Sequence, residues 1–131
     1  MLKHQFDIQV RPDYLPGQSS PLEDCYVFAY TITIVNSGSI AAQLVSRHWE
    51  IEDAFGETQE VDGLGVVGHQ PLLQPGEAFQ YTSSARLHTA MGIMSGHYFC
   101  VGIDGHRFEV PISTFVLRAD GAGATDEPPR H

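Results

Sequence analysis

The sequence is poor in positive charge. Lys3 is its only lysine, and 7 Lys and Arg stand against 16 Asp and Glu, for a formal net charge of −9. Nucleic-acid binding needs basic side chains that neutralise phosphates, so this composition argues against a nucleic-acid partner. An anionic membrane surface would repel the chain for the same reason.

Long apolar runs are also absent. No stretch of 18 apolar residues occurs, so no membrane insertion is expected. Residues 1–7 lack the apolar region of a signal peptide, which predicts a cytoplasmic protein. Only two cysteines occur, and free thiols are expected of a cytoplasmic chain. The alternation along residues 25–35 supports this, because Cys25 falls on the face opposite the bulky side chains.

The sequence lacks the pattern of a long helix and has instead short alternating segments separated by turns. We expect strands at residues 4–11, 25–35, 42–52, 57–61, 77–84, 97–103 and 106–117. Asp104-Gly105 predicts a two-residue hairpin that would place His106 opposite Ile103, and Pro111 predicts an edge strand or a bulge. Residues 62–76 read as loop, and residues 85–96 fit either a loop or one helical turn.

About seven strands with regular turns predict an all-β fold, a β-sandwich of the immunoglobulin or fibronectin type III kind. The sandwich domain would cover residues 1–119. Residues 120–131 have the composition of a disordered tail. Trp49 shares its strand face with Val45 and Ile51, so we expect it in the core. Arg47 shares this face as well and would need a carboxylate or carbonyl partner there.

One glycine pattern matches a phosphate-binding signature. Gly63, Gly65 and Gly68 form G-x-G-x-x-G, a spacing that can cradle pyrophosphate through backbone N–H groups. However, Pro71 and Pro75 follow closely and exclude the helix that completes such a site. We therefore favour a tight loop whose glycines adopt positive φ angles.

Other catalytic or metal-binding patterns are weak, so the sequence favours a binding module over an enzyme and predicts no cofactor. The seven histidines show no zinc spacing. No serine stands in a nucleophile elbow. Carboxylates crowd residues 50–62, which leaves weak divalent-cation binding open. They are Glu50, Glu52, Asp53, Glu57, Glu60 and Asp62.

The motifs together resemble the ApaG family. The resemblance covers residues 3–118 and rests on several motifs in order: Tyr30-Thr31-Ile32-Thr33-Ile34 with Asn36, Ser46-Arg47-His48-Trp49, Gly63-Leu64-Gly65-Val66-Val67-Gly68 with Gln70-Pro71, and Gly96-His97-Tyr98. It implies a fibronectin type III-like sandwich, an association with cobalt resistance and magnesium efflux, and a protein-interaction role. It also implies a pyrophosphate site at Gly63, Gly65 and Gly68.

Three functional hypotheses follow. The leading one is a cytoplasmic protein-interaction module whose partner is unknown and whose binding surface includes His48, His69 and Gln70. The second is a protein or enzyme that binds pyrophosphate or a nucleotide at Gly63–Gly68. The third is direct binding of a divalent cation by the acidic segment.

Overall fold

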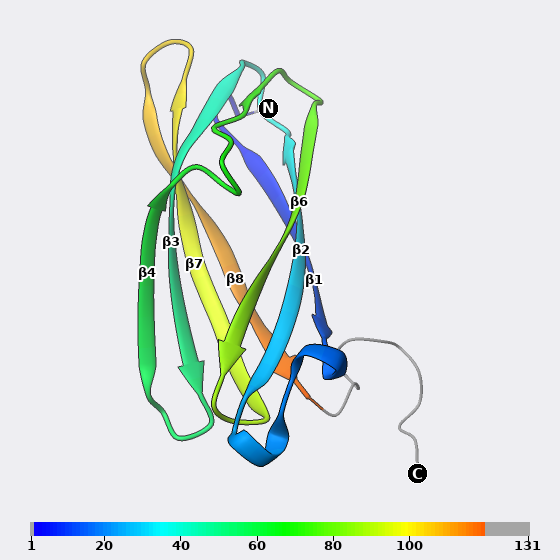
Figure 1. Ribbon diagram of the computed structural model, residues 1–131. Helices are drawn as coiled ribbons and strands as arrows, with labels where there is room; N and C mark the ends of the chain where they lie inside the picture. The colour runs from blue at the N-terminus through cyan, green and yellow to red at the C-terminus, as the bar shows by residue number, and fades with distance from the viewer. Residues whose placement is uncertain (1, 120–131) are drawn as a thin grey trace.

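The computed structural model describes residues 2–119, and its regular structure is almost entirely β-strand (Figure 1). The strands are β1 (Phe6–Tyr14), β2 (Tyr26–Asn36), β3 (Ala42–Asp53), β4 (Thr58–Leu64), β5 (Leu72–Leu73), β6 (Ala78–Leu87), β7 (Met91–Gly102) and β8 (Arg107–Arg118). Two short 3-10 turns, η1 (Pro16–Gln18) and η2 (Pro21–Glu23), join β1 to β2. Within residues 2–119, no helix has the length and apolar character needed to cross a membrane.

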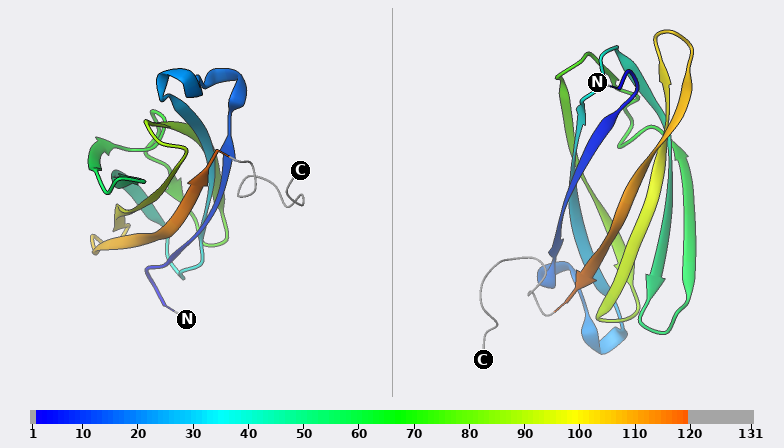
Figure 2. Two further views of the ribbon diagram at one scale, coloured as in Figure 1. Left: turned by 90° about the horizontal axis from the view of Figure 1, so that it is seen from below. Right: turned by 180° about the vertical axis from the view of Figure 1, so that it is seen from behind.

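The strands form two antiparallel sheets that face each other. One sheet has the order β1-β2-β6, and the other has the order β4-β3-β7-β8, with β5 paired to the start of β3. Seen from behind, β1 and β8 run along the same side of the molecule, and residues of the two strands are in contact (Figure 2). That side is closed. The edge strands β4 and β6 flank the opposite, open side (Figure 1).

The core is built from alternate residues, as a half-buried strand requires. In β2 the side chains of Phe28, Tyr30, Ile32 and Ile34 are all buried. Trp49 of β3 is 2% exposed, and its ring meets those of Tyr30 and Phe115 edge-on. The predicted all-β sandwich of the fibronectin type III-like kind is confirmed, and so is the core position of Trp49.

A β-bulge shifts the alternation of β3. Leu44 pairs with Cys100 and Ser46 pairs with Phe99, so Val45 is an extra residue opposite β7. The residues that face the core are therefore Ala42 and Leu44 before the bulge, and Arg47, Trp49 and Ile51 after it. The sequence reading placed Val45 with Trp49, but the bulge leaves Val45 only half-buried.

Three segments differ from the sequence prediction. β1 continues through Pro12 to Tyr14, because an edge strand tolerates a residue without an N–H. Residues 85–96 contain neither a long loop nor a helical turn: β6 and β7 extend into them. The connection at residues 88–90 is held by the Thr89 hydroxyl, which donates to the Met91 carbonyl and accepts from the Ala54 N–H. The two-residue strand β5 lies in the segment predicted as loop.

The hairpin at Asp104-Gly105 exists, but its register is not the one predicted. The Gly102 N–H donates to the His106 carbonyl, so His106 lies opposite Gly102 rather than Ile103. Gly105 has a φ of +84°, which fits a three-residue loop with a glycine bulge. Pro111 lies on the edge strand β8, as predicted. The proposed tail at 120–131 lies outside the described residues.

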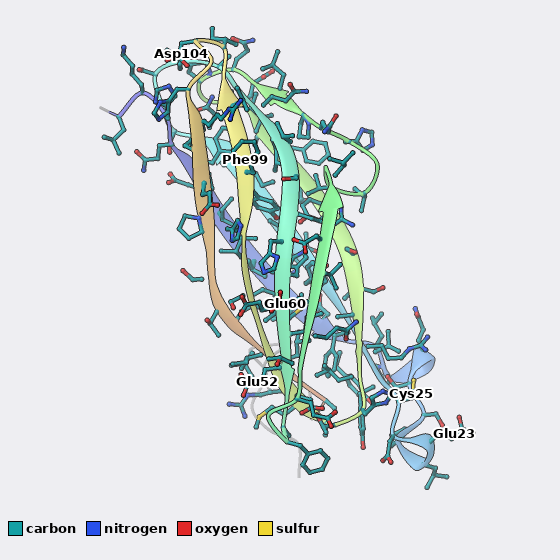
Figure 3. The ribbon with its side chains drawn as sticks, turned by 90° about the vertical axis from the view of Figure 1, so that its left-hand side faces the viewer. Glu23, Cys25, Glu52, Glu60, Phe99 and Asp104 are labelled. Carbon is teal, nitrogen blue, oxygen red and sulfur yellow. The ribbon has the colours of Figure 1, made fainter. Side chains whose placement is uncertain are left out.

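Both cysteines fall within the described residues and are free thiols. Figure 3 places Cys25 beside the 3-10 turns, while Phe99, the neighbour of Cys100, lies toward the other end of the molecule. Cys100 is fully buried, and this burial raises the pKa of its thiol to about 12. Cys100 therefore behaves as a small core residue rather than a nucleophile.

Replacing Trp49 should destabilise the fold strongly. Trp49→Ala removes a buried aromatic side chain and leaves a cavity, so we expect a loss of about 3–5 kcal/mol in the free energy of unfolding. Urea denaturation followed by circular dichroism measures this loss. A variant that unfolds at the same urea concentration as the wild type would contradict the core assignment.

The two thiols should differ in accessibility. In native, unreduced protein, Ellman's reagent should react with the half-buried Cys25 and leave Cys100 untouched. After denaturation without reductant, both thiols should react. Two rapidly reacting groups in the native protein would show that Cys100 is not sealed in the core, and none after denaturation would show a disulfide.

Candidate functional site

The glycine motif forms a tight turn after β4. Val67 and Gly68 have φ angles of +42° and +85°, and Val66 and His69 exchange two backbone hydrogen bonds of 2.7 and 2.9 Å. Two central residues with positive φ between such a pair define a type I′ turn. Gly65 has a φ of +63°, and a side chain there would also strike the His69 carbonyl oxygen. The positive φ angles expected of the motif thus occur at Gly65 and Gly68.

Gly63 instead leaves space for a side chain from β3. Its φ is not positive, but a Cβ at this position would lie 2.7 Å from the guanidinium carbon of Arg47. The guanidinium therefore occupies the place of a side chain on β4. Arg47 Nη1 donates to the carbonyl oxygens of Leu64 and Gly65, at 3.0 and 2.9 Å. These are the carbonyl partners that a core-facing arginine needs.

Backbone N–H groups of the turn are largely taken up within the protein. The Gly65 N–H donates to the Val45 carbonyl, and the N–H groups of Val66 and His69 donate to each other's carbonyls. A pyrophosphate site needs several N–H groups directed at the anion. Within the turn from Gly65 to His69, only the N–H groups of Val67 and Gly68 have no backbone acceptor among residues 2–119. Pyrophosphate binding at Gly63, Gly65 and Gly68 thus stays a prediction, with few donors to support it.

The segment between β4 and β5 bridges the two sheets, and it crosses the open side of the sandwich (Figure 1). Val66 is completely buried, and the ring of His69 lies 5.7 Å from that of Phe79 on β6. The Gln70 side-chain amide donates to the carbonyl oxygen of the bulged Val45. His69 and Gln70 therefore belong to one surface.

The segment from Leu64 to Leu72 also exposes three aliphatic side chains. Leu64 ends β4 and is 75% exposed, Val67 lies at the turn and is 49% exposed, and Leu72 begins β5 and is 50% exposed. Both β4 and β5 pair with the same edge of β3. We call Leu64, Val67 and Leu72 the loop patch. The sequence reading named the neighbouring His69 and Gln70 but not these three residues.

His48 lies on the outer face of the four-stranded sheet. Figure 3 looks onto this face, along which Glu52, Glu60 and Phe99 are labelled. His48 Nδ1 lies 2.6 Å from Asp62 Oδ1, and its ring stacks on that of His97 at 5.0 Å. Hydrogen bonding to Asp62 raises the pKa of His48 above its ordinary value of 6.5, and Glu50 adds to this. His48 makes no hydrogen bond, ion pair or ring contact with His69 or Gln70 within residues 2–119, but on β3 it lies two residues from Ser46, the partner of Leu64.

The acidic segment surrounds this histidine. Glu50 and Glu60 approach His48 Nε2 to 3.5 and 4.0 Å, and His97 on the next strand lies 3.6 Å from Glu109. Among residues 2–119, no three His, Cys, Asp or Glu side chains are arranged to hold a metal ion. The carboxylates around His48 favour its imidazolium form, so the arrangement on this face favours binding of a proton.

Fold and site together define a single β-sandwich domain. On the open side of this sandwich, an arginine anchors a type I′ turn. The ApaG domain family model matches residues 16–102. A protein named ApaG from Acidovorax sp. strain JS42 is 60% identical over 98% of this chain and 95% of its own length. Another from Ralstonia nicotianae is 61% identical over 89% of this chain and 94% of its own length. The chain belongs to the ApaG family.

Solved structures agree with this assignment. The crystal structure of a Bordetella pertussis protein named ApaA superposes with a TM-score of 0.88 at 53% identity, covering 89% of this chain and 95% of that one. A domain of β-glucuronidase 2 from Bacteroides uniformis, with a TM-score of 0.53 at 13% identity, shares the fold alone.

The proton affinity of His48 should depend on Asp62. In Asp62→Asn the pKa of His48 should fall, because the largest cause of its rise is removed. A raised pKa in the folded state stabilises the protein below the unfolded value of about 6.5, and that stability is lost as the pH rises through the folded pKa. NMR titration of the His48 ring proton measures the shift. An unchanged pKa of His48 in Asp62→Asn, together with a lower pKa in Glu50→Gln, would show that Glu50 and not Asp62 is the main cause.

Proposed function

We propose that this protein is a cytoplasmic protein-interaction module that binds its partner through the loop patch, with His69 and Gln70 beside it. An interaction surface on a small domain consists of exposed apolar side chains rimmed by polar ones. Leu64, Val67 and Leu72 supply the apolar part. The association with cobalt resistance and magnesium efflux, which the family resemblance implies, would then belong to the partner.

The conformation of Val67 carries this proposal. A β-branched residue with positive φ is strained, and such strain costs about 1–3 kcal/mol. The first central position of a type I′ turn usually holds asparagine or aspartate, followed by glycine. Here the side chain is valine, and half of its surface faces solvent, so burial does not offset the strain. Strain at an exposed residue points to a role outside the fold's own stability.

Stability should improve when this strain is removed. Val67→Asn restores the usual Asn-Gly sequence of the turn, so the free energy of unfolding should rise by about 1 kcal/mol. Thermal denaturation measures the change. Val67→Ile is the control, because it keeps a β-branched side chain and should leave the stability near that of the wild type. If Val67→Asn is the less stable protein, the side chain of Val67 supports the fold and the argument from strain is lost.

Partner capture should depend on the loop patch. We would immobilise the wild type and a variant with Leu64→Gln, Val67→Asn and Leu72→Gln, and compare the proteins retained from the native cell extract by quantitative mass spectrometry. The wild type should retain a partner that the variant loses, because the apolar contact area is gone.

A matched control variant replaces exposed apolar residues at the other end of the sheet. Phe55→Gln, Met91→Gln and Ile93→Gln remove a comparable number of exposed apolar side chains around the β3–β4 hairpin. This variant should retain the partner. Loss of the partner in the control, with retention in the loop-patch variant, would move the interface to the hairpin end and contradict the proposal.

A further inference from the structure

A groove lies on the open side of the sandwich, between the edge strands β4 and β6. One hollow of it has a volume of about 290 Å³ and is lined by Tyr30, Arg47 and Trp49 from the inner faces, with Ser83 and Arg86 from β6. Two adjoining hollows continue along the same strands and share Gln59 and Arg86 with it. The groove is therefore a continuous feature of the open side, distinct from the loop patch.

Its charge differs from that of the rest of the protein. The 290 Å³ hollow is lined by two arginines, Arg47 and Arg86, and by no aspartate or glutamate. The whole chain has 16 acidic against 7 basic residues, so two unopposed guanidinium groups in one hollow are unusual. Among the described residues, neither arginine has a carboxylate within ion-pair distance. The hollow thus favours an anion.

Trp49, one of the lining residues, carries a buried donor without an acceptor. Only 2% of Trp49 is exposed, yet its indole Nε1 has no hydrogen-bond partner within residues 2–119. A buried N–H without a partner costs about 1–3 kcal/mol. Arg47, two residues away on the same strand face, uses only Nη1 for the carbonyls of Leu64 and Gly65. Nε and Nη2 of Arg47 make no hydrogen bond to the described residues.

Further polar and apolar groups complete the lining. The Tyr30 hydroxyl is near Ser83 and is protonated at neutral pH, and burial raises its pKa further. Val61, Ile51 and Met94 form apolar walls. The lining therefore combines a few convergent donors with an apolar body, which is the usual make-up of a small-ligand site.

We infer that this groove binds a small organic acid, with its carboxylate toward Arg47 and Arg86 and its apolar body against Val61 and Met94. A planar carboxylate matches the free edge of one guanidinium and can accept from a second donor. Asp53 and Glu57 line the adjoining hollow and disfavour a larger polyanion that extends into it. The inference does not rest on the proposed function, because none of its residues belongs to the loop patch.

Trp49 is the only tryptophan, so its indole N–H resonance reports on the groove without ambiguity. We would titrate the protein with benzoate, and in parallel with benzamide, its neutral isostere. Benzoate should shift the indole N–H signal saturably, while benzamide should bind at least about tenfold more weakly, because it lacks the charge that the arginines recognise. Inorganic phosphate serves as a third probe for a general anion site.

Two variants link the signal to the groove. Arg86→Gln changes an exposed residue that makes no side-chain hydrogen bond in the described structure, so it should fold normally and weaken benzoate binding severalfold. Arg107→Gln, on β8 away from the groove, makes the same change of charge and should bind benzoate as the wild type does. Arg47→Lys keeps the charge but loses the planar guanidinium, which can donate two parallel hydrogen bonds to a carboxylate, and should weaken binding further.

The outcomes are decisive in each direction. Saturable binding of benzoate, weak binding of benzamide and phosphate, and a loss confined to Arg86→Gln and Arg47→Lys would support the inference. No indole shift with benzoate, or equal shifts with benzamide, would overturn it. Phosphate binding as tight as that of benzoate would overturn the assignment to an organic acid, and equal losses in Arg86→Gln and Arg107→Gln would reduce the effect to net charge.

Discussion

The open side of this sandwich depends on the hydrogen bonds from the Arg47 guanidinium to the carbonyl oxygens of Leu64 and Gly65. They join the inner face of β3 to the end of β4 and fix where the type I′ turn begins. Gly63 leaves the space that the guanidinium fills, and Val66 beyond it closes the core. Because a half-buried guanidinium must find acceptors, the position of the turn follows from the position of Arg47.

The bulge at Val45 prepares this arrangement. It shifts the alternation of β3, so Arg47 and Trp49 both point inward, and it leaves the Val45 carbonyl free of β7. That carbonyl accepts from the Gly65 N–H and from the Gln70 side chain. The one extra residue thus has two effects. It points Arg47 toward the turn, and it provides the Val45 carbonyl as an acceptor for the segment that contains the turn. Bulges near functional surfaces commonly re-aim side chains in this way.

The sequence was sufficient for most of the strands and most of the core, because both follow from local alternation. The even-numbered face of β2 and the inward position of Trp49 could be read from residue spacing alone. The groove could not, since β4 and β6 approach only through the pairing of two sheets, and Arg86 is far from Arg47 in sequence. Nor could the role of Gly63: a glycine motif suggests a backbone angle, whereas the space here is taken by a side chain from another strand. The bulge itself left only a weak signal in the sequence, because a regular two-residue alternation can place Val45 or Leu44 toward the core but not both.

The loop patch and the groove lie on two sides of the same anchored turn. Arg47 contacts the carbonyls beneath the turn and also lines the groove, so a ligand that draws on its remaining N–H groups acts on the residue that positions Leu64 and Gly65. A partner on Leu64 and Val67 acts on the same segment from outside. Two ligands that bias one structural element must alter each other's affinity by equal factors. Under the two proposals, an organic acid in the groove would therefore modulate partner binding, and the partner would modulate acid binding to the same extent. Neither site needs to touch the other for this coupling, because both would act on the segment that Arg47 contacts.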